Sequence, residues 1–412
     1  MQSTTARFAT ILLTALALAG CGVGPFAQAA DDAPSVASVA TTVAPPRTSA
    51  AVTSTSVVVT TVPPTVSLPP TTLVPPTTPA PATTVPPAAA PMTAQAAPAT
   101  TVVPPVLPPP PTWVPYTPLA AQVGASPLTG LALDEATSRL PTVVVKVDNA
   151  RGARGQWGLD SADVVFEENV ESLTRFVAVF HSRRPGEVGP VRSARTGDLA
   201  LLAAFNRPVL AWSGGNAGVT SWVRSAASAG VVVDLSAQLR NGCYRRDKKR
   251  KAPHNLVLSM QCATDRAVAA GAGSPLALWS FLPAGQAPVG ASAGTFDVKM
   301  DGVKVRWVWD PATARYLRFQ DGKPHLTAAG VQIGATNVVV LAVPHLPSVV
   351  DARTPEPQTV GTGTVVVHSG GGAQSGTWTR ESASTGWTFT AADGSTIGLI
   401  PGTTFVELTR AG

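Results

Sequence analysis

Hydrophobic and polar positions follow two different patterns in the region after residue 118. In its first half, short runs of β-branched and other apolar residues predict buried strands, and apolar residues at helical spacing predict helices between them. The expected strands are 142–147, 208–212 and 231–234, and the expected helices are 199–205, 219–229 and 259–270. Strands that alternate with helices favour an α/β layer structure.

Residues 163–170 and 174–182 predict a hairpin within this first half. Side chains alternate between the two faces of a strand, so Glu167, Glu171 and Arg175 are expected to share a polar face. The simplest interpretation is that this face is the solvent side of a half-buried antiparallel sheet.

From residue 292 onward the pattern changes to short alternating runs separated by Gly-rich turns, which is typical of strands. The expected strands are 295–300, 304–309, 316–320, 338–343, 364–368, 376–381, 387–391 and 404–408. The sequence therefore predicts an α+β protein: an N-terminal α/β domain at 118–275 and a smaller β-rich C-terminal domain at 290–412, with a hinge at 271–290.

The first 20 residues have the pattern of a lipoprotein signal peptide. Arg7 precedes an apolar run at 8–18, which is too short to span a bilayer as a mature helix. Small residues directly before Cys21 indicate cleavage there and lipidation of the cysteine; the alternative is an ordinary secretory signal. A pair of acyl chains anchors a protein stably, so we expect a lipid-anchored protein on the extracytoplasmic face of the cell membrane.

Residues 21–117 are rich in Pro, Thr, Ala and Val, and Asp31, Asp32 and Arg47 are their only charged residues. Such a composition predicts a disordered tether without a core of its own. Proline-rich chains rise about 3.1 Å per residue, so the tether reaches on the order of 200–300 Å when extended. This length suits a spacer through a thick cell wall.

Because the signal peptide predicts that the protein is exported, its cysteines and its charge are interpreted for a protein outside the cell. Besides Cys21 the chain has only Cys243 and Cys262, which we expect to form a disulfide outside the cell. The formal net charge is +6, and the basic run 245–251 would suggest nucleic-acid binding inside a cell. Outside the cell we expect no nucleic acid, and the available partners are anionic envelope polymers or lipid head groups. A merely solvated loop is the alternative.

The most distinctive stretch is 187–195, in which a Gly-Pro turn precedes Arg192 and Arg195. If the following helix begins near Ser193, both arginines lie by its N-terminus, where backbone N–H groups and the helix dipole favour an anion. Two guanidinium groups suit a carboxylate or phosphate. Alternatively, both arginines pair with acidic side chains of this chain.

Most catalytic templates are absent from the sequence. It has no G-x-S-x-G, H-E-x-x-H, Cys-x-x-Cys or Walker motif, and its five histidines are scattered, so we expect neither a metal nor a cofactor. What remains is a set of polar residues expected to form a ligand-binding cleft in the first domain. These residues are Asp148, Asn149, Arg154, Glu167, Glu171, Arg175, Arg192, Arg195, Lys251, His254 and Asn255. His254 is the best candidate for proton transfer or hydrogen bonding to a ligand.

Several short motifs occur in an order that resembles a known family. They are Pro-Leu-Thr-Gly-Leu at 127–131, Val-Asp-Asn at 147–149, Thr-Arg-Phe at 174–176, Gly-Pro-Val-Arg-Ser-Ala-Arg at 189–195, Lys-Ala-Pro-His-Asn at 251–255 and Gly-Lys-Pro-His at 322–325. Over residues 124–410 the chain is similar to the YerB-like bacterial lipoproteins, a two-domain family of unknown function. The resemblance implies two domains and a lipid anchor, but no reaction.

Three functions therefore stay open. The leading hypothesis is a binding protein for an anionic cell-envelope glycan or polymer, because the arginines suit its carboxylate or phosphate groups. The second is a hydrolase of a wall glycan or phosphodiester, in which carboxylates act as acid and base. The third is a scaffold for other envelope proteins, in which case the charged residues form a structural ion-pair network.

Overall fold

The computed structural model describes residues 107–115, 117–283 and 285–412. The predicted signal peptide, Cys21 and most of the predicted tether lie outside the described residues. Of the tether's last residues, Trp113 packs against the hydrophobic core. Within the described ranges no helix has the length and hydropathy needed to cross a membrane.

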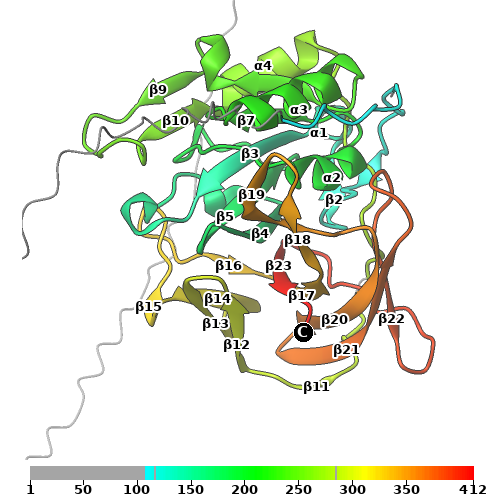
Figure 1. The fold of residues 1–412 in the computed structure, drawn as a ribbon. Coiled ribbons are helices and arrows are strands. Elements are labelled where there is room, and N and C mark those ends of the chain that lie inside the picture. The colour runs from blue at the N-terminus through cyan, green and yellow to red at the C-terminus, as the bar shows by residue number, and fades with distance from the viewer. Residues whose placement is uncertain (1–106, 116, 284) are drawn as a thin grey trace, which may run out of the picture. The chain divides into compact units, whose positions relative to one another are not determined.

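One large sheet contains strands from both halves of the chain (Figure 1). Its strands from the first half are β3 (Val143–Asp148), β4 (Val164–Val170), β5 (Leu173–Phe180), β7 (Val209–Trp212) and β8 (Val233–Ser236). Those from the second half are β11 (Ala291–Ser292), β17 (Asn337–Val343), β20 (Gly361–Ser369), β21 (Gly372–Arg380), β22 (Thr388–Ala391) and β23 (Thr404–Arg410). The order among the described residues is β11-β21-β20-β17-β23-β4-β5-β3-β7-β8, with β22 on β21. The last strand, β23, pairs in parallel with both β17 and β4, and so joins the two halves.

Helices cover the part of the sheet that comes from the first half. They are α1 (Glu135–Ser138), α2 (Asp198–Leu202), α3 (Ala217–Ser228) and α4 (Met260–Ala269), with short 3-10 turns at Arg151–Ala153, Leu159–Ser161, Ala203–Phe205 and Ala237–Leu239. Apolar residues of α2 and α3 pack on one face of the sheet, and those of α4 pack on the other. Asn216 and Ser259 cap α3 and α4 through their side-chain oxygens.

Smaller sheets complete the fold. One consists of β6 (Glu187–Val188), β10 (Leu256–Ser259) and β9 (Tyr244–Arg246). Another consists of β12 (Thr295–Met300), β13 (Val303–Asp310), β14 (Arg315–Gln320), β15 (Lys323–Pro324) and β16 (Gly334–Ala335). The two-stranded sheets are β1 (Gly124–Ala125) with β2 (Ala132–Leu133), and β18 (His345–Ser348) with β19 (Asp351–Pro357).

The protein is mostly β with few helices, and three expectations need correction. The helix expected at 199–205 is α-helical over Asp198–Leu202 and continues as a 3-10 turn over Ala203–Phe205, so it does not begin near Ser193 and does not place Arg192 at its N-terminus. The polar face of the 163–182 hairpin is not on the solvent side, because every residue of β4 is buried and Glu167 has no exposed surface. The α/β layer is only partial: β3, β7 and β8 are parallel, but they share their sheet with the C-terminal strands.

Candidate functional site

The candidate site lies at the carboxyl end of β3, where three segments meet. Asp148 is the last residue of that strand. The segment after β6 runs along it: Asp148 donates its N–H to the Pro190 carbonyl, and Arg192 donates its own to the Lys146 carbonyl. The loop between β9 and β10 supplies His254. The carboxyl edge of parallel strands is where ligands commonly bind in open sheets, and β7 ends at the same edge.

Asp148 connects Arg192 and His254. His254 Nδ1 lies 2.6 Å from Asp148 Oδ2, and Arg192 Nε lies 3.2 Å from the same oxygen. A carboxylate only accepts hydrogen bonds, so Nδ1 carries the proton and Nε2 of a neutral His254 is an acceptor. The Asp148 side chain is 1% exposed, whereas those of Arg192 and His254 are 22% and 25% exposed. A buried carboxylate therefore orients two groups that reach solvent.

Arg195 belongs to a second cluster beside the first. Its guanidinium donates to both carboxylate oxygens of Glu171, with Nη2 at 2.6 and 2.7 Å, and Thr354 donates to Glu171 at 2.5 Å. Partial burial acts to raise the pKa of Glu171, but the hydrogen bonds from Thr354 and Arg195 outweigh it and the pKa is lowered. Both arginines thus pair with a carboxylate of this chain, Arg192 with Asp148 and Arg195 with Glu171, which is the alternative that the sequence left open.

Arg175 lies between the two clusters. It donates to the Ser193 carbonyl at 3.1 Å, and its Nη2 is 4.0 Å from Glu171 Oε2. Burial, followed by the positive charges of Arg195 and Arg192, lowers the pKa of Arg175 to about 10. Three guanidinium groups therefore gather around the carboxylates of Asp148 and Glu171, which leaves an excess of positive charge.

Residues beneath these clusters were missed by the sequence reasoning. Lys146 is fully buried, pairs with Glu168 and donates to Asp198 Oδ1 at 2.7 Å. The other oxygen of Asp198 accepts the Arg195 N–H at 2.7 Å, so this triad holds the backbone that carries Arg192 and Arg195. The signal was a lysine inside the apolar run 143–147, which should have suggested a buried ion pair.

Asn149 and Glu167 lie in a different, buried network. Glu167 accepts hydrogen bonds from Asn149 at 3.1 Å and Thr174 at 2.6 Å, and from Arg318 of the second half at 2.5 Å. Arg318 is also 2.5 Å from His325 Nδ1 and has no exposed surface. Glu167 is therefore inaccessible from solvent, and the carboxylate that contacts Arg192 is that of Asp148.

The remaining predicted residues are spread over the loops around the site. Arg154 pairs with Asp321. Asn255 is buried and donates to the carbonyls of Asp247 and Arg250, which orders the basic loop. Lys251 is exposed, and its side chain makes no hydrogen bond or ion pair within the described part of the chain.

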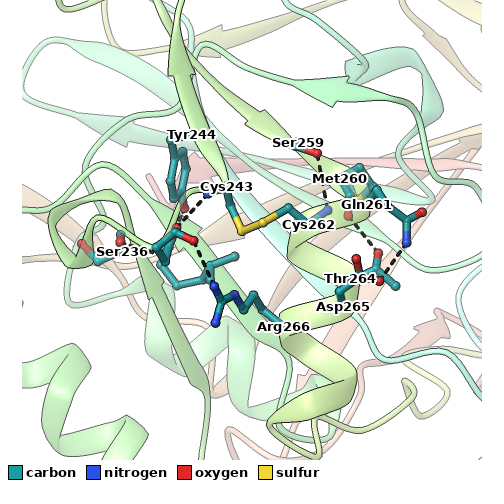
Figure 2. The surroundings of a disulfide bond; sticks show 12 residues. Ser236, Cys243, Tyr244, Ser259, Met260, Gln261, Cys262, Thr264, Asp265 and Arg266 are labelled. Carbon is teal, nitrogen blue, oxygen red and sulfur yellow. Dashed lines mark hydrogen bonds between the residues drawn. A yellow bond between two sulfur atoms is a disulfide. The ribbon is translucent and has the colours of Figure 1, made fainter.

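The predicted disulfide is present between Cys243 and Cys262, with their Cα atoms 5.3 Å apart. Figure 2 shows that it joins the residue before β9 to the first turn of α4. Asn241 supports this junction, accepting from Cys243 N at 3.1 Å through its side chain and from Arg266 at 3.2 Å through its carbonyl. The disulfide therefore anchors the base of the hairpin that carries His254.

The arrangement allows two kinds of chemistry. An anion can accept hydrogen bonds from the terminal nitrogens of Arg192, which have no partner among the described residues. A histidine oriented by a buried carboxylate is also the arrangement of a general base. Within the described residues, no three or more His, Cys, Asp or Glu side chains gather in a way that would hold a metal ion.

Comparison with known proteins places this chain among proteins of unknown function. Residues 128–272 match the N-terminal domain, and residues 296–406 the C-terminal domain, of the family described as "Protein of unknown function (DUF3048)". The chain is 35% identical over 136 residues to "Putative lipoprotein YerB" of Bacillus subtilis, a match that spans 32% of this chain and 40% of that relative.

A crystal structure of the YerB protein from Bacillus subtilis has the same fold. It aligns with a TM-score of 0.59 at 23% identity and covers 69% of this chain and 96% of that one. The two domain matches together span more than half of the 412 residues. The chain therefore belongs to the two-domain, YerB-like family of unknown function (DUF3048).

Proposed function

We propose that this protein is a cell-envelope lipoprotein that binds an anionic glycan or polymer through Arg192 and its neighbours. The lipid anchor is supported by the small residues before Cys21 and by the name of the Bacillus relative, a putative lipoprotein. Anchoring at Cys21 would hold the domain on the outer face of the cell membrane, next to the wall polymers.

One observation carries the binding proposal. Asp148 and its contacts hold Arg192 in place, yet its terminal guanidinium nitrogens are free of partners among the described residues. Arg175 and Arg195 add positive charge behind it, and the exposed Lys248, Lys249 and Lys251 add more on the adjacent loop. A polymer with phosphate or carboxylate groups would meet both a bidentate donor and a favourable field.

A second candidate function, hydrolysis of the same polymer, is favoured by the 2.6 Å contact between Asp148 and His254. In that reaction Asp148 would keep the proton on Nδ1, and Nε2 would accept a proton from an attacking water. Arg192 would then stabilise the negative charge that develops on the substrate.

Incubation of the purified chain with isolated wall fractions separates these functions. Binding predicts salt-sensitive co-sedimentation with no soluble products. Hydrolysis predicts soluble fragments that disappear in the variant His254→Ala. A scaffold for envelope proteins would give neither result and would contradict both candidates.

The anchor is tested independently with Cys21→Ala. Loss of the lipid should release the protein into the medium and make its processing insensitive to globomycin. If the variant sediments with membranes as firmly as the wild type, the proposed anchor is wrong.

A further inference from the structure

A hollow of about 1100 Å³ lies on the small sheet of the second half, apart from Asp148, Arg192 and His254. Residues 297–300 of β12 and 303–306 of β13 form much of its lining, together with Val308, Phe319 and Arg151. Small-molecule sites typically enclose about 300–1000 Å³, so this hollow is large enough for one ligand of low molecular mass. Figure 1 shows these strands at a distance from the helical layer, with β12 and β13 side by side.

Part of the lining of the hollow is apolar. Trp307 and Arg318 have no exposed surface and point into the protein. Their neighbours in sequence, Val308 and Phe319, lie on the opposite face because side chains alternate along a strand, and both are half-buried. Phe319 lies directly opposite Arg306 in the β13–β14 register, so apolar surface adjoins the Asp297–Arg306 ion pair.

The lining also carries positive charges that have no ion-pair partner among the described residues. Lys299 and Lys304 lie directly opposite each other in the β12–β13 pair, an arrangement that like charges normally disfavour. Both are exposed, and neither side chain makes an ion pair or hydrogen bond within the described ranges; the same holds for Arg151. The two carboxylates of the lining are already paired, Asp297 with Arg306 and Asp321 with Arg154.

We propose that this hollow binds single molecules of an anionic amphiphile. The apolar chain would lie over Val308 and Phe319, and a phosphate or carboxylate head group would lie between Lys299 and Lys304. The facing lysines then have a shared counter-ion, which accounts for two like charges at directly paired positions. This site does not depend on the function proposed for Arg192.

Dodecyl phosphate, below its critical micelle concentration, is the probe for this site. The protein is the chain from 22 to 412, which retains every described residue, and binding is measured by isothermal titration calorimetry. We expect saturable binding of one molecule per chain. Three compounds serve as controls. Inorganic phosphate lacks the dodecyl chain, and dodecyl maltoside and dodecyltrimethylammonium lack the negative head group. Each should bind at least about tenfold more weakly than dodecyl phosphate.

Two variants locate the binding. Lys299→Glu with Lys304→Glu should weaken it by at least about tenfold, since two charge-assisted contacts are lost, and Phe319→Ser should weaken it without changing the charge. Lys323→Glu is the matched control, because Lys323 is exposed on β15 of the same sheet but does not line the hollow. Circular dichroism checks that each variant is folded, and Lys299→Gln replaces the double variant if that one is not.

Four results would overturn the proposal. They are no binding of dodecyl phosphate, equal binding of the cationic or neutral dodecyl compound, equal weakening by Lys323→Glu, and binding only to vesicles of anionic lipid and not to the monomeric probe. The last result would indicate that the unpaired positive charges of the lining bind a membrane surface and not a single ligand. Arg192 variants should leave dodecyl phosphate binding unchanged, which keeps this test separate from that of the wall-polymer site.

Discussion

At the residue scale, the position of His254 depends on the absence of a side chain at position 152. A Cβ on Gly152 would lie 2.7 Å from His254 Cδ2, closer than carbon atoms approach without a clash. The backbone of Gly152 is not in the left-handed region, so alanine is acceptable there apart from this contact. The glycine leaves room for the imidazole to reach Asp148.

We predict that Gly152→Ala displaces the His254 ring and breaks its hydrogen bond to Asp148. The nitrogen resonances of His254 in NMR spectra should shift, while the free energy of unfolding changes by about 1 kcal/mol or less. Gly186→Ala is the control, since nothing lies within 4 Å of a Cβ there. Unchanged His254 resonances in Gly152→Ala would contradict the described contact.

A second residue-scale prediction concerns pH. Burial lowers the pKa of His368 to about 4, and its ring stacks on Phe296 with centroids 3.4 Å apart. In the unfolded chain the pKa is near 6.5, so between pH 6.5 and 4 the unfolded state binds the extra proton. The folded state therefore loses stability as pH falls through this window, by up to about 3 kcal/mol.

The variant His368→Phe keeps a ring against Phe296 but cannot titrate. Denaturant titrations of both proteins from pH 7 to pH 4 should show a smaller acid loss of unfolding free energy in the variant. His345→Phe is the comparison, because the pKa of His345 is also lowered by burial but by less. Identical pH profiles for wild type and His368→Phe would exclude His368 as a source of the acid sensitivity.

At the element scale, local patterns predicted the positions of the strands well, but they predicted poorly which other segments contact them. The β-branched run 142–147 and the hairpin at 163–182 were found because their signals are local. The helix does not extend back to Ser193, because Val191 bridges to Val147 and holds the arginine segment extended. This pairing joins segments more than 40 residues apart. Glu167 was assigned to solvent because its partner Arg318 lies in the other half of the chain.

The same reason explains how much of the site could be predicted. Asp148, Arg192 and His254 were all among the candidates, since charged residues in short motifs stand out. Only the tertiary structure shows that these three residues lie together and that Asn149, Glu167 and Arg154 lie elsewhere. The supporting triad of Lys146, Glu168 and Asp198 was missed, although a lysine within a buried apolar run was visible in the sequence.

The disulfide gives a prediction at the element scale. Cys243 and Cys262 are separated by 19 positions, and closing a loop of about this length stabilises the folded state by roughly 3 kcal/mol. Replacing both cysteines by serine should lower the free energy of unfolding by about that amount. Amide hydrogen exchange should rise first in the β9–β10 hairpin that carries His254. Uniform exchange changes, with none larger in the hairpin, would contradict the anchoring role.

At the scale of the whole molecule, the two halves share one sheet and one buried network. β23, from the C-terminal end, lies between β17 and β4. Trp307 and Glu407 of the second half bond at 2.9 Å beside Glu167 and Arg318, and burial, with the nearby charge of Glu167, raises the pKa of Glu407 well above its usual value. Neither half completes its own core.

We therefore predict that the segment 118–275 does not fold alone. Without β23, the strand β4 would expose an unpaired edge, and Glu167 would lose Arg318. The isolated segment should show no cooperative unfolding transition, whereas co-expression with 276–412 should restore one. A separately folded 118–275 segment, with sharp NMR dispersion, would show that the shared sheet is dispensable.

The most direct test of the proposed function is the affinity of Arg192 variants for isolated anionic wall polymer. Arg192→Met removes the charge and the planar donor, and we expect binding to weaken by at least about tenfold, with Arg192→Lys intermediate. Arg224→Met removes an exposed arginine elsewhere, on α3, and should leave affinity unchanged at equal salt. Equal affinities of Arg192→Met, Arg224→Met and the wild type would contradict the assignment of Arg192 as the anion-binding residue.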